Sequence, residues 1–311
     1  MKAFIVAAPG SAEQLVLRDI SIPRPGPGEV LVRVKAISIN PVDVKSRAGK
    51  GLYGRLKELD PLILGWDISG EVIQSESTEF AAGDEVFGMV NFPGHGQAYA
   101  EYVVAPAAHL ARKPANITHA EAAASTLAAL TAWQALVDHA KVKAGDRVLI
   151  HAASGGVGHF AVQLAKHLGA VVTGTSSSRN RGFVNGLGAD RHIDYQTQDF
   201  RDATGKTDFV LDAIGGENAE RSLDCIRPGG TLISIPSGLS EELTALAKSR
   251  QIDAYFFLVK SDGGQMQQIA RLLQEGILKA HVFKTYPFDE LPEAHEELEK
   301  GRTVGKIVVL L

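Results

Sequence analysis

Residues 147–158, RVLIHAASGGVG, constrain the fold more than any other stretch of the chain. The apolar run 148–150 ends in small residues, and the glycine-rich run 155–158 then opens an apolar helical pattern. A buried strand, a glycine turn and a helix N-terminus in this order form a phosphate cradle, because only glycine lets the backbone both turn tightly and approach the anion. The pattern is A-x-G-x-x-G, with Ala153 where the usual fingerprint has glycine. We interpret it as a dinucleotide site; the alternative is a purely structural turn.

The second half of the chain alternates strand and helix patterns. Strands are expected at 147–152, 170–175, 207–213, 230–235 and 253–258, with helices between them. This alternation is typical of an α/β fold with a parallel, doubly wound sheet of the Rossmann type, which binds its ligand at the carboxyl ends of the strands.

The first half of the chain differs from this in composition and in its apolar pattern. It is rich in Pro and Gly, and Val30, Val32 and Val34 alternate with their neighbours, which predicts antiparallel or barrel-like strands. A capping-box pattern at 117–121 predicts the start of a long alanine-rich helix, apolar nearly all round and therefore buried between layers. The final strand, KIVVLL, is expected to return to the first domain. We expect a substrate domain formed by 1–117 and 264–311, and a nucleotide domain formed by 118–263.

Charge and cysteine content exclude several classes of function. The net charge is −4 without a basic block, and no apolar run approaches the roughly 20 residues that span a bilayer, so we expect neither nucleic acid nor membrane as a partner. Cys225 is the only cysteine, which excludes intrachain disulfides and cysteine-based zinc sites. We interpret it as a small buried apolar residue. The lack of disulfides fits a cytoplasmic protein.

The segment after the second strand bears on the choice of cofactor. An NAD site usually has an acidic residue about 20 residues past the glycines, yet no carboxylate lies between Gly158 and Asp190. The strand ends in Thr175 and three serines, followed by Arg179. Hydroxyls and a guanidinium suit a 2′-phosphate, which favours NADPH over NADH. The alternative is a serine-rich helix cap followed by an exposed arginine.

Further residues are expected to line the nucleotide cleft. Tyr195, in the segment HIDYQTQDF, is a candidate for packing on the adenosine or binding the 2′-phosphate, or for ordinary packing. The predicted cofactor-binding set is Thr131, Ser154, Gly155, Gly156, Val157, Gly158, Ser176, Ser177, Arg179, Tyr195, Ile214 and Ile235. We interpret His95 and His151 as a loop residue and a strand-end core histidine.

Six motifs resemble those of medium-chain dehydrogenases/reductases, in the same order. They are ISINPVDVKSRAG, LGWDISGEV, GDEVFGM, AYAEYVV, LTAWQAL and AASGGVG. The chain is most similar to the zinc-independent quinone oxidoreductase (zeta-crystallin-like) branch, which includes enone and alkenal reductases. This resemblance implies a GroES-like catalytic domain around a Rossmann domain, NADPH as cofactor, a homodimer, and a role for Thr131 at the nicotinamide.

The sequence departs from the zinc-containing members of that family. Those members have a cysteine where this chain has Asn40, and a His-Glu pair near its Trp66-Asp67. They also carry a four-cysteine lobe that is missing here. Because a catalytic zinc site needs about three N or S ligands, we expect no metal.

The candidate catalytic residues are Asn40, Asp43, Lys45, Tyr53 and Asp67. Asn40 and Asp43 also fit a helix cap and its first-turn acid. In similar enzymes the residue matching Asn40 touches nicotinamide or substrate. Lys45 either anchors cofactor or substrate, or is a solvated lysine. Tyr53 is a candidate proton donor or substrate wall, or packs in a loop. Asp67 is alternatively a buried acid paired with Arg or Lys.

The sequence therefore predicts an NADPH-dependent, zinc-free oxidoreductase that transfers hydride to quinones or α,β-unsaturated carbonyls. Two alternatives stay open. One is a 2-enoyl-thioester reductase, whose pocket would admit a pantetheine arm. The other is a non-catalytic NADPH-binding protein of the crystallin or sensor kind.

Overall fold

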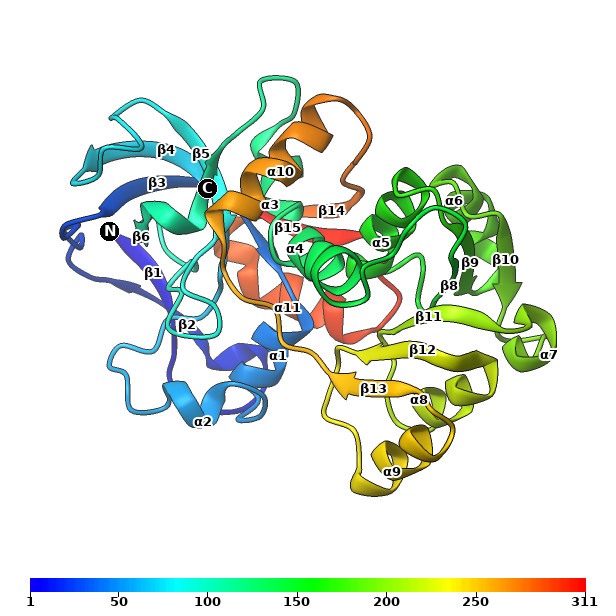
Figure 1. Cartoon of the computed structure of the whole chain (residues 1–311). Helices are drawn as coiled ribbons and strands as arrows, with labels where there is room; N and C mark the ends of the chain where they lie inside the picture. Colours follow the sequence, from blue (N-terminus) through cyan, green and yellow to red (C-terminus); the bar gives the residue numbers. More distant parts are fainter. The chain divides into compact units, whose positions relative to one another are not determined.

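The chain folds into two compact units in a computed structural model that describes residues 1–311. One unit comprises Met1–Leu130 with Val259–Leu311, and the other comprises Thr131–Leu258 (Figure 1). These bounds differ from the expected domain limits at 117/118 and 263/264. The difference at the first limit arises because helix α3 (His119–Ala124) packs against strands of the first unit.

The first unit is built on strands that pair antiparallel, except that β14 and β15 pair parallel. Its strands are β1 (Lys2–Val6), β2 (Leu15–Asp19), β3 (Glu29–Ile39), β4 (Asp67–Ser75), β5 (Glu85–Met89), β6 (Tyr102–Pro106), β7 (Leu110–Arg112), β14 (Val282–Pro287) and β15 (Lys306–Leu310). Its helices, besides α3, are α1 (Pro41–Arg47), α2 (Tyr53–Leu56), α10 (Gly263–Gln274) and α11 (Leu291–Glu299). Seven strands form one sheet in the order β14-β15-β3-β4-β5-β7, with β6 also paired to β3.

Strand β3 is the centre of this sheet. It pairs antiparallel with β4, β6 and β15, as the alternation of its valines predicts, and Val30, Val32 and Val34 are all buried. The C-terminal strand β15 therefore returns to the first unit, which confirms the expectation for KIVVLL. Because β15 begins beside Ile39, its first residue is placed next to the start of α1.

The alanine-rich segment differs from the single long helix that was expected. The capping box is confirmed, since the Thr118 amide donates to Glu121 Oε2 at 2.8 Å. The segment then divides into α3, α4 (Leu127–Trp133) and a π-helix (Gln134–His139). The break falls at Ser125 and Thr126, whose hydroxyls donate to carbonyls of the preceding turn at 2.7 and 3.0 Å and so compete with the helix ladder.

The second unit contains a six-stranded parallel sheet. Its strands are β8 (Arg147–Ile150), β9 (Val171–Ser176), β10 (Arg191–Asp194), β11 (Thr207–Asp212), β12 (Ile226–Ser234) and β13 (Asp253–Phe256). Its helices are α5 (Gly156–His167), α6 (Arg181–Gly186), α7 (Phe200–Thr204), α8 (Glu217–Ser222) and α9 (Glu241–Ser249). The order β10-β9-β8-β11-β12-β13 is that of the Rossmann fold, and it confirms the predicted doubly wound sheet.

The strand order reverses between β8 and β11. Crossovers from β8 run toward β9 and β10, and those from β11 run toward β12 and β13, so right-handed connections place their helices on opposite faces of the sheet. Figure 1 shows α5 and α6 along β8–β10, and α8 and α9 along β11–β13. A sheet of this order opens a crevice at its carboxyl edge, at the point of reversal.

Candidate functional site

The glycine turn lies at this point of reversal, directly after β8. Helix α5 begins at Gly156 with Gly155 as its N-cap, as predicted. A Cβ on Gly158 would collide with the carbonyl oxygen of Ala152 and lie 2.8 Å from the Cα of Ala153, so only glycine lets α5 pack this closely on the turn. The first N–H groups of a helix have no partner within the helix, and α5 begins just beyond the carboxyl end of β8.

The turn is tied to the segment after β9. Ser154 Oγ accepts a hydrogen bond of 3.0 Å from the side-chain amide of Asn180, which follows Arg179 in a short 3₁₀ turn. Ser176 and Ser177 are buried, and Ser176 Oγ lies 2.7 Å from His192 Nε2 on the neighbouring strand. The predicted glycines and serines are therefore brought together on adjacent strands.

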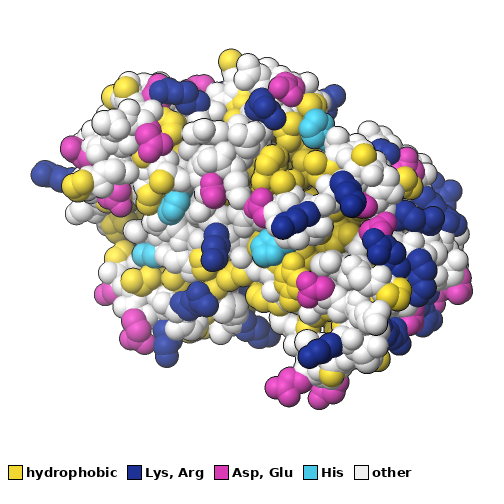
Figure 2. Space-filling view, in the orientation of Figure 1, with side chains coloured by type: hydrophobic (Ala, Val, Ile, Leu, Met, Phe, Trp, Pro, Cys, Tyr) yellow, Lys and Arg dark blue, Asp and Glu magenta, His cyan; other side chains and the backbone are white.

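The end of β9 carries positive rather than negative charge. Arg179 is exposed and makes no ion pair, and Arg181, two residues further on, is also exposed. Figure 2 shows Lys and Arg side chains gathered at the right of the view, where Figure 1 draws α6, β9 and β10. No carboxylate stands at the position where an acidic residue usually accepts hydrogen bonds from the ribose.

Three more predicted cofactor residues occupy the same edge. Tyr195 follows β10, and its amide donates to the Ser176 carbonyl at 3.4 Å. Ile214 follows β11, and the amide of Ile235 donates to the Asp212 carbonyl at 3.0 Å. The side chains of Tyr195 and Ile214 are 57% and 52% exposed, so both are accessible to a ligand at this edge of the sheet.

Thr131 and Val157 complete the predicted set. Thr131 lies on α4 and is buried, and Val157 is partly buried in the first turn of α5.

Asp212, at the end of β11, is a further residue of this edge. Its carboxylate accepts hydrogen bonds from the amides of Ile214 and Gly215 at 3.1 and 2.9 Å and from the Asn218 side chain at 2.8 Å. The Asp212 carboxylate therefore holds the loop after β11 in one conformation. A carboxylate that ends a buried strand and is followed by two glycines is the sequence signal that would have identified it.

The remaining histidine and cysteine predictions in this unit are confirmed. His151, at the end of β8, is buried between Thr175 Oγ1 at 3.1 Å and Ser222 Oγ at 2.9 Å, and burial lowers its pKa to about 3. Cys225 is buried in the apolar core, where burial raises the pKa of its thiol to about 11. A neutral thiol in a packed core is not a nucleophile.

In the first unit, three of the five candidate catalytic residues form one buried group. Asn40 is the N-cap of α1, and its amide N–H donates to Asp43 Oδ2 at 2.5 Å, as the capping interpretation predicts. The Asn40 side chain donates to Asp67 Oδ2 at 2.8 Å, and Asp67 Oδ1 accepts from the Leu127 amide at 3.0 Å. Asn40, Asp43 and Asp67 are almost fully buried.

Lys306 of β15 supplies the cation of this group, and sequence reasoning missed it. Its ammonium donates to the Asn40 side-chain oxygen and to the Ile39 carbonyl at 3.0 Å, and lies 3.7 Å from Asp67 Oδ2. The interpretation of Asp67 as a buried acid paired with Lys is thus confirmed. A lysine at the head of an otherwise apolar strand was the available signal.

A second buried chain of polar groups lies beside α1, and sequence reasoning missed it as well. Arg47 pairs with Glu299 Oε1 at 2.5 Å and donates to His295 Nδ1 at 3.3 Å. Because an arginine only donates, His295 carries its proton on Nε2 and donates it to the Tyr99 hydroxyl at 2.8 Å. Burial lowers the pKa of His295 to about 3, so this chain holds a neutral histidine in one tautomer.

Burial raises the pKa of both acids. Burial, reinforced by the nearby charge of Asp67, raises the pKa of Asp43 to about 8, so this acid is mostly protonated at neutral pH. Burial also raises the pKa of Asp67, but Lys306 and the Asn40 amide oppose that effect. Lys306 is therefore the cation that opposes the effect of burial on Asp67.

The positions of Lys45 and Tyr53 do not distinguish the catalytic from the structural alternatives for these residues. Lys45 is exposed on α1, and Tyr53 begins the short helix α2 with a partly buried side chain. His95 lies half-buried in a loop, as expected.

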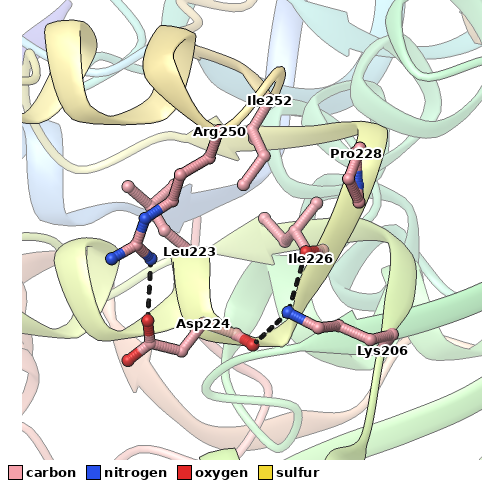
Figure 3. Close-up of a pocket in the computed structure, with 7 residues that line it drawn as sticks. All are labelled: Lys206, Leu223, Asp224, Ile226, Pro228, Arg250 and Ile252. Atoms are coloured by element: carbon pink, nitrogen blue, oxygen red, sulfur yellow. Dashed lines mark hydrogen bonds and ion pairs between the residues drawn. The ribbon is translucent and has the colours of Figure 1, made fainter.

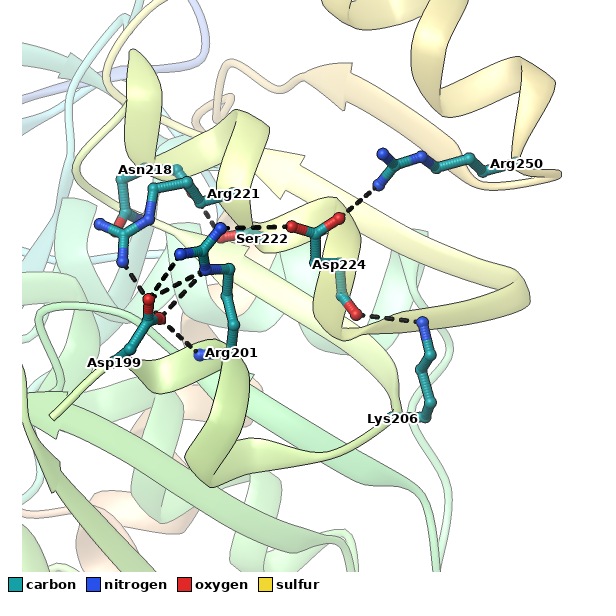
Figure 4. Close-up of polar contacts among 8 residues, drawn as sticks. All are labelled: Asp199, Arg201, Lys206, Asn218, Arg221, Ser222, Asp224 and Arg250. Carbon is teal, nitrogen blue, oxygen red and sulfur yellow. Dashed lines mark hydrogen bonds and ion pairs between the residues drawn. The ribbon is translucent and has the colours of Figure 1, made fainter.

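A separate cavity of about 390 Å³ opens at the amino ends of β11, β12 and β13, on the edge of the sheet away from the glycine turn (Figure 3). Its two cations already have partners within the unit. Arg250 pairs with Asp224 at 2.7 Å, and Lys206 donates to the Asp224 carbonyl at 3.0 Å. Figure 4 shows that Asp224 also belongs to a surface network with Arg201 and Asp199. These charges join short elements of the surface, and we assign them no ligand.

Comparison with known proteins identifies the family. A model of the alcohol dehydrogenase GroES-like domain matches residues 26–115, and a model of zinc-binding dehydrogenases matches 187–309. The quinone oxidoreductase of Coxiella burnetii is 37% identical, with a TM-score of 0.94 over 100% of this chain and 99% of that one. The chain belongs to the medium-chain dehydrogenase/reductase family.

Two curated members of the family extend the comparison. The quinone-oxidoreductase homolog of spinach chloroplasts is 33% identical over 96% of this chain and 95% of its own length. The 2-methylene-furan-3-one reductase of tomato is 31% identical over 99% of this chain and 79% of its own length. Other matching members are named NAD(P)H oxidoreductases. These relatives support an oxidoreductase that uses a nicotinamide cofactor.

The donor set in this member of the family fits zinc poorly. No three or more His, Cys, Asp or Glu side chains are grouped so that they could hold a metal ion. Asn40 and Asp67 offer only oxygens, and the Lys306 ammonium lies against both. A catalytic zinc ion needs about three N, S or carboxylate ligands and would be repelled by that ammonium.

No helix of this member has the length and apolar character needed to cross a bilayer. Its named relatives include chloroplast and mitochondrial proteins, so the cytoplasmic location stays a prediction.

Proposed function

We propose that this protein is an NADPH-dependent, zinc-free reductase of quinones or α,β-unsaturated carbonyls. The observation that carries the cofactor choice is the end of β9, where Ser176, Ser177 and Arg179 stand and no carboxylate does. A 2′-phosphate is favoured by hydroxyls and a guanidinium and repelled by a carboxylate. The substrate class is supported by relatives named for a quinone and for a conjugated furanone.

The residues that would hold NADPH are those of the predicted set. The N-terminus of α5 with Ser154–Gly158 would bind the pyrophosphate, and Ser176, Ser177, Arg179 and Tyr195 the adenosine and its 2′-phosphate. Thr131, Ile214 and Ile235 would line the nicotinamide half. Bound NADPH supplies the hydride.

The first unit would supply orientation and a proton. Asn40 is proposed to orient the nicotinamide or the substrate, because its side-chain amide is fixed by Lys306 and Asp67. Lys45 is proposed to anchor the cofactor or polarise the substrate carbonyl. Tyr53 or a water molecule would donate the proton that completes reduction.

A turnover assay tests the function. Purified protein is mixed with NADPH or NADH and a panel of quinones, enals, enones and a 2-enoyl thioester, and loss of absorbance at the nicotinamide band is followed. We expect quinones or conjugated carbonyls to accelerate oxidation of NADPH more than that of NADH. NADPH binding without turnover on any acceptor would instead identify a non-catalytic binding protein.

Replacing Arg179 tests the choice of cofactor. We expect Arg179→Ala to raise the dissociation constant for NADPH about tenfold and to leave that for NADH unchanged, because only NADPH carries the 2′-phosphate. Fluorescence titration of both cofactors measures this.

Arg191→Ala is the matched control for that test. It removes the same charge from the same unit, but Arg191 pairs with Thr173 and so lies three residues from the carboxyl edge of the sheet. Equal losses for both variants, or no loss for Arg179→Ala, would contradict the assignment.

The other expected properties have direct checks. Elemental analysis of the purified protein should give no stoichiometric zinc. Light scattering should give the mass of a homodimer, twice 33.1 kDa. The substrate and nucleotide domains expected at 1–117 with 264–311 and at 118–263 are testable by limited proteolysis.

A further inference from the structure

Lys306 is more deeply buried than any other lysine of the chain, and its ammonium has defined oxygen partners. Its side chain is 3% exposed, although it lies in a sheet whose neighbouring residues Ile307, Val308 and Val309 are apolar and buried. Lysine is almost never buried in this way unless its charge is paired and its donors are satisfied. Three oxygens around its ammonium meet that requirement.

These oxygens come from separated parts of the chain. They are the Ile39 carbonyl at 3.0 Å, the Asn40 side-chain oxygen, and Asp67 Oδ2 at 3.7 Å. Carbonyl, amide and carboxylate oxygens are the ligands that surround a hard cation in proteins. Here the ammonium of Lys306 occupies the position of such a cation.

The ammonium also determines how the Asn40 amide is turned. An ammonium only donates and an ionised carboxylate only accepts, so the Asn40 oxygen must face Lys306 and its NH₂ must face Asp67. The Ser38 carbonyl, 3.5 Å from the Asn40 amide nitrogen, favours the same orientation, and the ammonium is the side-chain donor that holds the oxygen end.

We propose that the Lys306 ammonium is the resident cation of this site and that it acts as a positioning residue, orienting the Asn40 amide and keeping the Asp67 carboxylate charged. The positioning role rests on the proposed function, whereas the charge pairing does not. Burial lowers the pKa of Lys306 and the charge of Asp67 opposes that effect, as expected for a paired cation.

A double-mutant cycle tests the pairing without any turnover assay. Lys306→Met and Asp67→Asn each leave one buried charge alone, and each should lower Tm by roughly 10 °C. The double variant leaves neither charge, and its decrease in Tm should be about half of the sum of the two single-variant decreases. Additive losses would overturn the proposal.

The matched control cycle is Lys113→Met with Glu85→Gln. Lys113 has a buried stem and an ion pair of 3.1 Å, but Glu85 is half exposed, so water screens the pair. The decreases in Tm of the two single variants should therefore add up to that of the double variant.

Chemical rescue tests the positioning. Lys306→Ala removes the side chain beyond Cβ, which n-propylammonium replaces in length and charge. We expect the variant to lose kcat about tenfold with little change in KM, and the amine to restore both kcat and Tm. Propanol and sodium chloride should restore neither. Equal rescue by propanol, or wild-type kcat in Lys306→Met, would overturn the positioning role.

The two readouts separate this inference from the proposed function. If the wild-type protein reduces no acceptor, the proposed function fails, and the Tm cycle still decides whether Lys306 is the paired cation. If turnover is present and the cycle is additive, the inference alone fails.

Discussion

Gly158→Ala should destabilise the protein by about 3 kcal/mol and weaken dinucleotide binding together, because one methyl group must displace backbone on both sides of the turn. The new Cβ would collide with the Ala152 carbonyl oxygen and crowd the Ala153 Cα. Neither atom is the flexible end of a side chain, so α5 itself must move away from the turn. The helix N-terminus that we assign to the pyrophosphate moves with it.

Gly182→Ala is the control for this substitution. Gly182 lies in α6 of the same unit, and a Cβ there would meet no atom within 4 Å. That variant should be as stable as the wild type or about 0.5–1 kcal/mol more stable, since alanine is the better helix former. Urea unfolding and NADPH titration of both variants measure the effects. Wild-type stability and affinity in Gly158→Ala would show that the turn is not held as tightly as the structure has it.

The nucleotide unit was predictable because its signals are local. The strand, glycine turn and helix of 147–158 follow one another in sequence, and each has its own pattern of apolar or small residues. Strand β10 lies outside the five expected strand ranges. It has only four residues, three of them polar, and its bounds could not be set from that pattern. Its pairing with β9 defines it, and pairing is not visible in sequence.

The buried site of the first unit was predictable only in part, for the opposite reason. Asn40 and Asp43 stand three residues apart and cap one helix, which a sequence pattern shows. Lys306 meets Ile39 across 267 residues of chain, and His295 meets Tyr99 across 196. Such contacts depend on which strand lies beside β3, so spacing alone did not reveal either partner.

The pH dependence of stability should reveal that Asp43 is a neutral acid. Its pKa is about 8 in the folded protein, against an ordinary value of 3.8, because it is buried beside Asp67. Between these values the folded protein binds a proton that the unfolded chain has lost. The contribution of Asp43 to the free energy of unfolding is therefore fully present below about pH 4 and is lost as the pH rises toward 8. This free energy changes by at most about 1.4 kcal/mol per pH unit.

The hydrogen bonding of the carboxyl group gives independent support for this protonation state. Asp43 Oδ2 accepts from the Asn40 amide, while Oδ1 is buried without a hydrogen-bond partner. A negatively charged oxygen in that position would carry the full cost of desolvating a charge, whereas a protonated Oδ1 carries only the smaller cost of an unpaired hydroxyl. Asparagine has the same shape and can still accept from the Asn40 amide, so Asp43→Asn removes the titration with little loss of packing.

We therefore expect the stability difference between Asp43→Asn and the wild type to grow in favour of the variant from pH 5 to pH 8, by up to about 4 kcal/mol, and to level off above pH 8. Urea unfolding at unit steps of pH measures the difference. Asp84→Asn is the control, because hydrogen bonding to Arg112 lowers the pKa of Asp84 and its titration ends below this window. Its difference from the wild type should be a constant offset. A flat difference for Asp43→Asn would mean that Asp43 is ionised, and the group would then hold two carboxylates against the single ammonium of Lys306.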